Sequence, residues 1–396
     1  ILNSYFCIHI HVTMKATLCL ILFLNLSVWS LLGQVHFTRL NNEDGLSHSE
    51  VKAILQDSYG YMWISTRNKL NRYDGCEFKV LDCYDSIANK RNNNTAALCE
   101  DMNRLLWVGT DEGVFIYDPV VETFTYLERW LNLQDAGFLY NWVSNIVADK
   151  EGNMWIVLPS CGILKVNVQT KAYKLYSNFG HTVFEKGGPL SLTVDGQGAV
   201  WVGCIDQGIC RYDKTKDDFV QVLEETGVFR GKGVYAMLSC KESLFVALHE
   251  GRLLRYNKET GTLALHDFPE VDNVMIRCLM MPKDEELWVG TNNGVYIYNL
   301  LTENCTVFRN DSFDSHSLSC NTVTDMYIDK EKGIWVGTLY GGLNYQSRSA
   351  GNFTVYIPND HPQSVQSQWI HGLYWDADMQ KLWVGTEDEG CSVFDK

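Results

Sequence analysis

Short apolar runs alternate with polar turns along nearly the whole chain, and a cluster resembling Trp-Val-Gly-Thr marks each cycle of this pattern. The cluster decays in the middle of the chain, where it reads Phe-Val-Ala-Leu. Successive clusters begin 43 to 48 residues apart, and a period in the forties predicts an array of one supersecondary unit. The clusters begin at Trp63, Trp107, Trp155, Trp201, Phe245, Trp288, Trp335 and Trp383.

Each unit contains four apolar runs of four to six residues. The first run, such as Val51–Leu55, leads through an acidic turn to the second, which holds the cluster. A polar turn that ends in Gly, such as Asp111–Gly113, precedes the third run, and a fourth run such as Phe78–Leu81 follows. Four Val-, Ile- and aromatic-rich strands per unit predict an all-β fold, a β-propeller of four-stranded blades. We expect the Trp to pack between blades and the Gly to take a turn conformation.

The number of blades is open at this point. His36–Leu40 resembles a fourth strand that stands alone before the first unit, and the last unit ends at Lys396 after its third strand. The chain forms either seven blades at residues 34–350, followed by the start of a truncated second propeller at 351–396, or eight blades closed by the N-terminal strand. In the eight-blade alternative, closure by the two termini removes exposed sheet edges.

The N-terminal segment predicts export. Met14-Lys15 followed by the apolar run Ala16–Leu32 is typical of a signal peptide, which we place at residues 14–33. We interpret residues 1–13 as an upstream or non-native segment. The formal net charge of −15 argues against nucleic-acid binding. Eleven cysteines follow the leader without a repeating pair or zinc-type spacing, so we expect buried thiols rather than a disulfide framework or a metal site.

The repeat resembles a known family. The segment VKAILQDSYGYMWISTRNKLNRYD, residues 51–74, and the opening FTRLNNEDGLSHSEV, residues 37–51, are similar to the two-component regulator propeller repeat and to the start of mature sensors in that family. The resemblance implies the periplasmic sensor region of Bacteroides-type hybrid two-component systems, which respond to oligosaccharides and control polysaccharide-utilisation genes. It also implies a homodimer in a membrane-anchored full-length sensor. Because the sequence holds no kinase or DNA-binding part, we expect either a fragment or a chain whose signalling half has been lost.

A ligand site is expected where the loops that lead into the first strands meet the turns between second and third strands, since both surround the mouth of the channel. Aromatic platforms beside amides suit sugars, and cations suit carboxylate or sulfate groups. The aromatic and amide candidates are Tyr140, Asn141, Trp142, Tyr340 and Trp369. The cationic candidates are Arg67, Lys232 and Arg277.

Two other classes of function are weighed against this. A propeller that binds only proteins is the main alternative. A lyase or glycosidase is a further one, because a glycosidase needs two carboxylates at one bond. Carboxylates in the turns between second and third strands, which could converge on one face, are Asp111, Glu112, Asp206 and Glu250. No nucleophile motif, phosphate loop or metal-ligand spacing supports catalysis, so we expect no enzyme, no cofactor and no metal.

Overall fold

The computed structural model describes residues 36–134, 136–180, 182–185, 187–222, 227–248, 251–266, 274–348, 358, 364–367 and 369–395. The predicted leader at 14–33 and the upstream segment at 1–13 lie outside these residues. So does the apolar run Phe353–Tyr356, which the repeat pattern predicts as a fourth strand. The chain divides after Arg348 into two compact units, and each is described by itself. No helix in the described part of the chain is long and apolar enough to cross a membrane.

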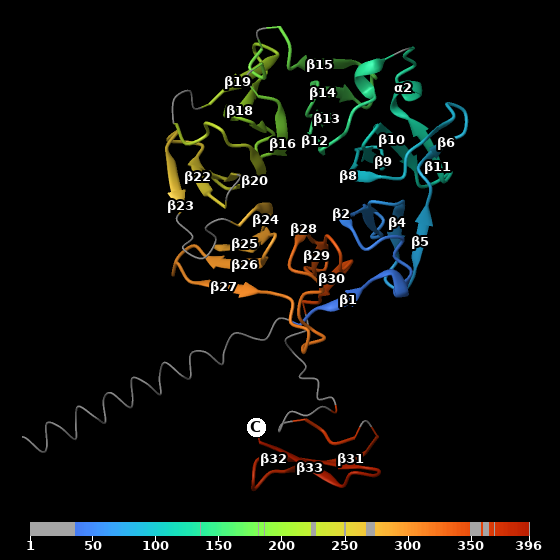
Figure 1. Cartoon of the computed structure of the whole chain (residues 1–396), viewed down its shortest axis with the longest axis vertical. Helices are drawn as coiled ribbons and strands as arrows, with labels where there is room; N and C mark the ends of the chain where they lie inside the picture. The colour runs from blue at the N-terminus through green and yellow to red at the C-terminus, as the bar shows by residue number, and fades with distance from the viewer. Residues whose placement is uncertain are drawn as a thin grey trace, which may run out of the picture. The chain divides into compact units, whose positions relative to one another are not determined.

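Residues 35–348 form a ring of seven four-stranded antiparallel sheets, which we number as blades in chain order (Figure 1). Blade 1 holds β2 (Val51–Gln56), β3 (Met62–Thr66), β4 (Leu70–Tyr73) and β5 (Phe78–Leu81); blade 2 holds β8 (Thr95–Glu100), β9 (Leu106–Thr110), β10 (Gly113–Asp118) and β11 (Thr123–Tyr126); blade 3 holds β12 (Asn145–Ala148), β13 (Asn153–Leu158), β14 (Gly162–Asn167) and β15 (Tyr173–Ser177); blade 4 holds β16 (Pro189–Val194), β17 (Val200–Cys204), β18 (Gly208–Asp213) and β19 (Asp218–Gln221).

The remaining blades continue the same order. Blade 5 holds β20 (Val234–Cys240), β21 (Ser243–Leu248), β22 (Leu253–Asn257) and β23 (Leu263–His266); blade 6 holds β24 (Ile276–Lys283), β25 (Glu286–Thr291), β26 (Gly294–Asn299) and β27 (Cys305–Phe308); blade 7 holds β28 (Val323–Ile328), β29 (Ile334–Thr338), β30 (Leu343–Gln346) and the N-terminal β1 (Thr38–Leu40). Short elements lie between blades: η1 (Asn42–Asp44), the hairpin β6 (Tyr84–Asp85) and β7 (Lys90–Arg91), α2 (Leu127–Trp130) and η2 (Gly137–Leu139).

The N-terminal strand closes the ring. β1 pairs with β30, with Thr38 opposite Tyr345 and Leu40 opposite Leu343, so the expected isolated fourth strand is found where the sequence placed it. The first strands of the blades contact one another in the cyclic order β2, β8, β12, β16, β20, β24, β28 and back to β2. The N-terminal strand, which the eight-blade alternative used for closure, joins the seventh repeat instead.

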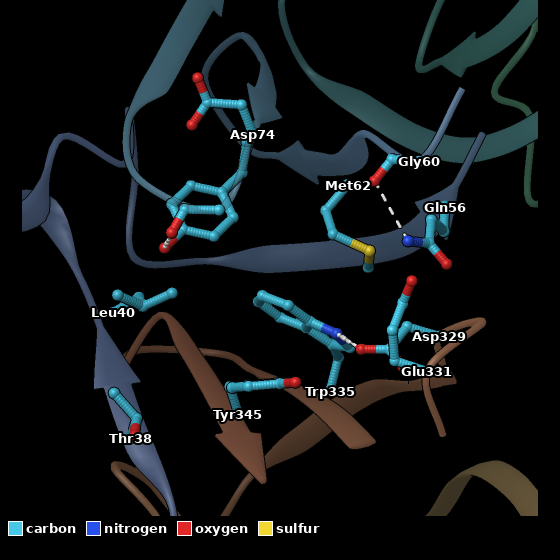
Figure 2. A pocket seen from close by; sticks show the side chains of 12 residues that line it. Thr38, Leu40, Gln56, Gly60, Met62, Asp74, Asp329, Glu331, Trp335 and Tyr345 are labelled. Carbon is cyan, nitrogen blue, oxygen red and sulfur yellow. Dashed lines mark hydrogen bonds between the residues drawn. The ribbon is translucent and has the colours of Figure 1, made fainter. Parts of the chain in front are cut away.

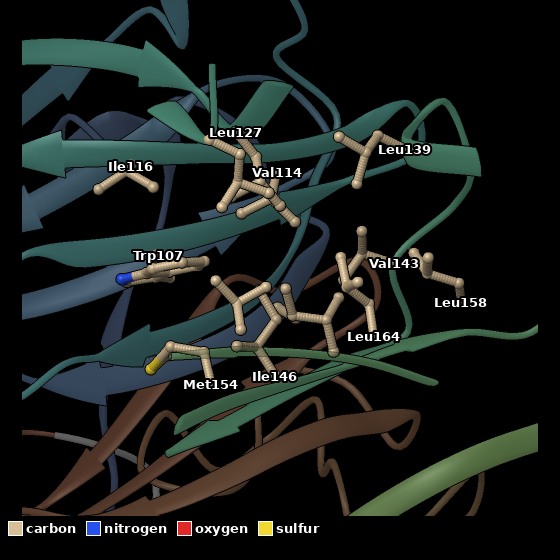
Figure 3. Close-up of a cluster of buried hydrophobic side chains, with 14 of the residues drawn as sticks. Trp107, Val114, Ile116, Leu127, Leu139, Val143, Ile146, Met154, Leu158 and Leu164 are labelled. Carbon is tan, nitrogen blue, oxygen red and sulfur yellow. The ribbon is translucent and has the colours of Figure 1, made fainter. Parts of the chain in front are cut away.

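The Trp of each cluster packs between blades, as predicted. Trp107 of blade 2 is fully buried against Ile146 and Met154 of blade 3, in the cluster that Figure 3 shows. Equivalent apolar clusters occupy the other six contacts between consecutive blades, which we call seams, and Phe245 takes the Trp position between blades 5 and 6. The seams therefore hold most of the apolar core of the ring.

An aspartate six residues before the Trp orients most of these rings. The indole Nε1 of Trp107 donates to Asp101 at 2.8 Å, and the backbone N–H groups of Asn103 and Leu105 donate to the same carboxylate. This pairing recurs in four more blades: Trp63 with Asp57, Trp155 with Asp149, Trp201 with Asp195 and Trp335 with Asp329. The acidic turn read from the sequence is thus part of these five seams, since its aspartate satisfies a buried indole donor.

The two repeated glycines have different roles. Gly113, which closes the turn after the cluster, has a φ of 103° and takes the expected turn conformation. For the Gly of the cluster the expectation is wrong, because its requirement is space. A Cβ on Gly109 would lie 2.6 Å from Val143 of the next blade, and one on Gly337 would lie 2.6 Å from Val51. The first strand of the following blade therefore packs directly on this glycine.

The second unit contains β31 (Ile370–Asp376), β32 (Lys381–Thr386) and β33 (Cys391–Asp395), which form a three-stranded antiparallel sheet. Large apolar side chains such as Leu373 and Tyr374 are exposed on it. The cysteine prediction is correct for Cys83, Cys204 and Cys210, which are buried, and wrong for Cys76 and Cys391, which lie in exposed positions.

Candidate functional site

One face of the ring carries both kinds of loop in which the ligand site was expected, and we call it the loop face. Hydrogen bonds tie the two kinds together. Val143 N donates to Thr110 O at 2.9 Å and Gly113 N donates to Asn141 O at 2.9 Å, so the loop into blade 3 is fixed to the turn of blade 2. Corresponding bonds join Asp206 to Lys232, Gly294 to Asn321 and Gly342 to Ser49. The loop face is a connected backbone framework.

A β-bulge at the loop-face end of the first strand adds one residue in most blades. The register shifts in six of the seven blades, for example between Val51 and Ala53 in β2. The extra residue is left out of the ladder and re-aimed by the bulge. The extra residues are Lys52, Ala96, Leu190, Tyr235, Arg277 and Thr324, and all are at least partly exposed. Sequence reasoning selected Arg277 and missed Lys52 and Tyr235, which directly follow the first buried Val of their units.

Lys52 belongs to a polar network on the loop face. Its Nζ donates to Asn94 Oδ1 at 2.6 Å, and Asn94 Nδ2 donates to Asp111 Oδ2 at 2.8 Å. Burial lowers the pKa of Lys52, while Glu50 and Asp111 act in the opposite direction. The predicted Arg67 joins the network from the turn of blade 1, with its guanidinium 3.5 Å from Glu50.

The three consecutive candidates in the loop into blade 3 differ in exposure and in partners. The hydroxyl of Tyr140 donates to Glu128 at 2.5 Å, and Lys90 Nζ lies 4.3 Å from the centre of its ring. Asn141 holds the loop, because its Nδ2 donates to Phe138 O and its carbonyl accepts from Gly113. Trp142 is 50% exposed, so it does not point into the core.

The other candidates are not all brought to one place. Tyr340 is 73% exposed in the turn of blade 7, and Arg277 is exposed at the start of β24. Lys232 is partly buried, and its carbonyl accepts from Asp206 N. Trp369 belongs to the second unit.

The acidic residues considered for catalysis include two that hold the framework. Asp111 accepts from Asn94, and Asp206 accepts from the backbone N–H of Gly231. Glu250 lies outside the described residues. These contacts give Asp111 and Asp206 a local structural role.

Comparison with known proteins identifies the repeat. The sequence model of the two-component regulator propeller family matches residues 45–68 and 317–340, which fall in blades 1 and 7. The chain therefore carries two-component regulator propeller repeats, as the pattern of Trp clusters indicated.

The chain is also similar to a histidine kinase in sequence and to several solved structures in fold. Histidine kinase P4 of Formosa agariphila is 25% identical over 166 residues, which are 40% of this chain and 12% of that protein. The extracellular domains of two putative hybrid two-component systems from B. thetaiotaomicron are each 21% identical, with TM-scores of 0.69 and 0.67; 91% of this chain covers 48% and 46% of them. PorZ of Porphyromonas gingivalis, a surface component of the type-IX secretion system, is 14% identical with a TM-score of 0.59, over 89% of this chain and 54% of PorZ. At these identities the solved structures show the propeller fold.

Proposed function

We propose that this chain is the ligand-reading part of a periplasmic two-component sensor and that its loop face recognises an oligosaccharide. The repeat family, the histidine kinase relative and the extracellular domains of similar fold support the sensor role. The chain spans about an eighth of the histidine kinase and about half of the solved domains, so transmission of the signal is assigned to parts beyond this sequence.

The observation that carries the oligosaccharide proposal is the exposure of aromatic rings on a fixed framework. Trp142 and Tyr340 stand largely in solvent, although the backbone around each is tied down by hydrogen bonds. An exposed ring on a rigid loop offers a stacking platform for the apolar face of a sugar at little cost in ordering. The guanidinium groups of Arg67 and Arg277 on the same face would take a carboxylate or sulfate group.

Signalling would then follow from differential binding. In a homodimeric sensor, a ligand held by the loop face favours one arrangement of the two copies only if it binds that arrangement more tightly. The dimer and the anchoring in the inner membrane are part of this proposal.

A thermal-shift screen of residues 34–396 against plant, host and microbial oligosaccharides tests the proposal. A ligand that binds only the folded chain raises the melting temperature with concentration. Tyr340→Ala should reduce the shift, whereas Tyr59→Ala, in a turn between first and second strands, should leave it unchanged. A cooperative melt without a shift for any glycan would count against the proposal and favour a propeller that binds only proteins.

A further inference from the structure

A pocket of about 400 Å³ lies at the seam where blade 7 meets blade 1 (Figure 2). Its walls come from β1, β29 and β30, from the turns between first and second strands of both blades, and from the end of β4. These turns leave the ring on the face opposite to the loop face. The pocket is therefore separate from the site proposed above.

The lining combines aromatic rings with carboxylates. Trp335 and Tyr345 have ring centres 4.4 Å apart, and the ring centre of Tyr73 lies 6.0 Å from that of Trp335. Asp74, Asp329 and Glu331 also line the pocket, and none of its lining residues is Lys or Arg. Aromatic faces and carboxylates both attract a cation.

The three carboxylates differ in the hydrogen bonds that they already make within the protein. Asp329 is buried and accepts from Trp335 Nε1 at 2.9 Å and from Gly333 N at 2.6 Å. The backbone N–H groups of Glu77 and Cys76 donate to Asp74 and lower the pKa of that carboxyl, so it is ionised at neutral pH. Glu331 makes no side-chain hydrogen bond or ion pair within the described part of the chain. Its carboxylate is available to a ligand.

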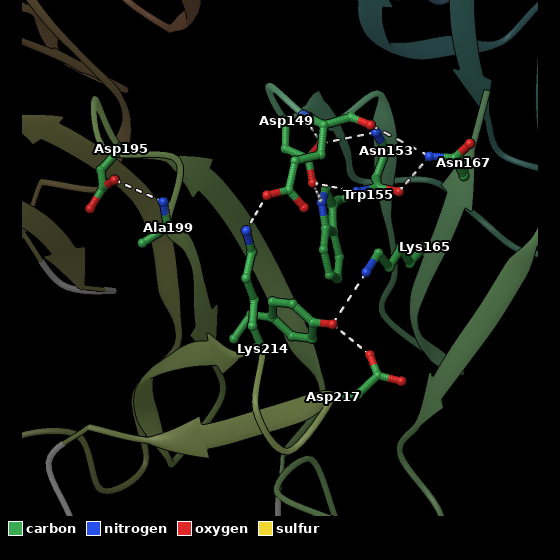
Figure 4. A network of polar contacts seen from close by, with 11 residues as sticks. Asp149, Asn153, Trp155, Lys165, Asn167, Asp195, Ala199, Lys214 and Asp217 are labelled. Atoms are coloured by element: carbon green, nitrogen blue, oxygen red, sulfur yellow. Dashed lines mark hydrogen bonds and ion pairs between the residues drawn. The ribbon is translucent and has the colours of Figure 1, made fainter. Parts of the chain in front are cut away.

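The seam between blades 3 and 4 shows what fills the same space elsewhere (Figure 4). Across β13 and β14, Trp155 faces Lys165, whose Nζ lies 4.9 Å from the ring centres of both Trp155 and Tyr212. A second ammonium group, that of Lys214, donates to Glu151. Two lysines of this chain thus occupy an aromatic and acidic seam.

The pocket at the closing seam lacks both lysines. Across β29 and β30, Trp335 faces Tyr345 in the register that Lys165 takes opposite Trp155. Gly75 follows Tyr73-Asp74 as Lys214 follows Tyr212-Asp213, and Glu331 stands two residues after Asp329 as Glu151 does after Asp149. The acidic and aromatic partners are kept, while the cations are replaced by a ring and by a residue without a side chain.

Other seams also supply a cation in this register. Arg211 lies over Trp201 at 5.7 Å, and Arg255 lies over Phe245 at 5.8 Å. Both arginines face these rings across the second and third strands, as Lys165 does. A cation on the seam ring is therefore a recurring feature of the fold.

We propose that the pocket at the closing seam binds a small organic cation with a primary ammonium group, which takes the place of the lysines of the seam between blades 3 and 4. The ammonium pairs with Glu331, and the alkyl part lies on Trp335, Tyr345 and Tyr73. The group comes from a free amine or from a lysine side chain of another protein. This binding does not depend on the proposed reading of oligosaccharides.

Isothermal titration of the purified chain at pH 7 with 1,5-diaminopentane tests the proposal, with 1,5-pentanediol as a neutral probe of the same length. We expect the diamine to bind and the diol to give no heat. A blocked peptide with a single central lysine serves as a second probe. Binding of the free diamine assigns the site to a small amine, and binding of the peptide alone assigns it to a lysine of a partner.

Variants locate the binding. Glu331→Gln, at an exposed turn position, should weaken binding at least tenfold, whereas Glu259→Gln, in an exposed turn of blade 5, should leave it unchanged. Tyr345→Lys should abolish binding, because the new ammonium occupies the pocket as Lys165 does in its seam; a cooperative thermal melt shows that this variant is folded. Absence of binding by both probes at millimolar concentration, or unchanged binding to Glu331→Gln, would overturn the proposal.

Discussion

The closing seam and the seam between blades 3 and 4 are packed in the same way, but their blades differ in how the chain completes them. Both place a Trp against the next blade and give its indole an aspartate, Asp329 in one and Asp149 in the other. Blade 3 is complete within one stretch of chain. Blade 7 is completed by β1, which comes from the opposite end of the ring unit, so hydrogen bonds replace chain continuity there.

The closing seam carries additional contacts that hold the N-terminal segment and the first strands. The guanidinium of Arg39 donates to Ser317 and Asp314 in the loop before blade 7. On the inner side, Asp325 Oδ2 accepts from Ile54 N at 2.8 Å. Closure is therefore held at the inner and outer strands, while the pocket between them is lined by aromatic rings and carboxylates, of which Glu331 makes no side-chain hydrogen bond within the described residues.

The largest loss of stability should come from a substitution that weakens the packing of the N-terminal segment, which closes the ring through β1. Phe37 is 1% exposed and packs with Leu318 and Val323 of the blade 7 region. Phe37→Ala should lower the free energy of unfolding by about 3–5 kcal/mol, as for other buried Phe truncations, measured by urea denaturation. Phe313→Ala is the matched control, because Phe313 is 99% exposed in the neighbouring loop. An equal loss in both variants would contradict the assigned role of β1.

The second prediction concerns the hydrogen bond between aspartate and Trp that both seams contain. Asp329→Ala leaves the indole of Trp335 and the backbone N–H of Gly333 without their acceptor. We expect a loss of about 2–3 kcal/mol, since an unsatisfied buried donor is costly. Asp149→Ala should cost a similar amount in its own seam. Urea denaturation of both variants checks the equality, and a much smaller loss at Asp329 would mean that water reaches the indole through the pocket.

A third prediction concerns pH and the inner side of the closing seam. Burial raises the pKa of Asp325 to about 7, despite hydrogen bonds from the backbone N–H groups of Ile54 and Met326. Because the folded state holds this proton more tightly than the unfolded chain, with its ordinary value of 3.8, the stabilisation is present below that value and is lost as pH rises toward 7.

Asp325→Asn separates this effect from all other titrations. The variant should gain roughly 1–2 kcal/mol of stability relative to the parent chain between pH 4 and pH 8, a discounted figure because Asp325 is only partly buried. Urea midpoints of the two proteins across this range provide the measurement. Parallel pH profiles would show that Asp325 titrates alike in the folded and unfolded chain.

The smallest change in stability, and the sharpest test of the comparison, comes from converting one seam into the other. Lys165→Tyr combined with Lys214→Gly gives the seam of blades 3 and 4 the residues of the closing seam. Surface ion pairs contribute little, so the thermal midpoint should hardly move. The double variant should gain a second binding site for 1,5-diaminopentane by calorimetry. A folded double variant with one site would show that removal of the lysines does not create a pocket.

Much of the fold could be predicted because the residues that define each repeat act within a single blade. The Trp cluster, the Asp six residues before it and the turn glycine such as Gly113 act within one blade, so periodicity alone reveals strands, turns and seams. The cluster glycine was misjudged because its requirement is set by Val143 of the next blade, a contact between repeats.

For the candidate site, the sequence predicted which face of the ring carries it but not how its residues are arranged. Topology places Trp142, Tyr340 and Arg67 on the loops of one side, but exposure and partners depend on neighbours that no repeat pattern specifies. The bulge that re-aims Lys52 and Tyr235 was not recognised, because an added residue in a ladder is visible only when both strands are paired.

The sequence by itself determined the repeat, the four strands of each unit, the buried Trp and the isolated N-terminal strand, since all of these follow from local hydrophobic periodicity. The tertiary structure alone decided that β1 completes blade 7, that bulge residues stand at the loop face, and that the closing seam keeps a pocket which lysines fill elsewhere. The physical reason is that these features depend on which blades become neighbours, and closure of the ring joins residues nearly 300 positions apart, such as Arg39 and Ser317.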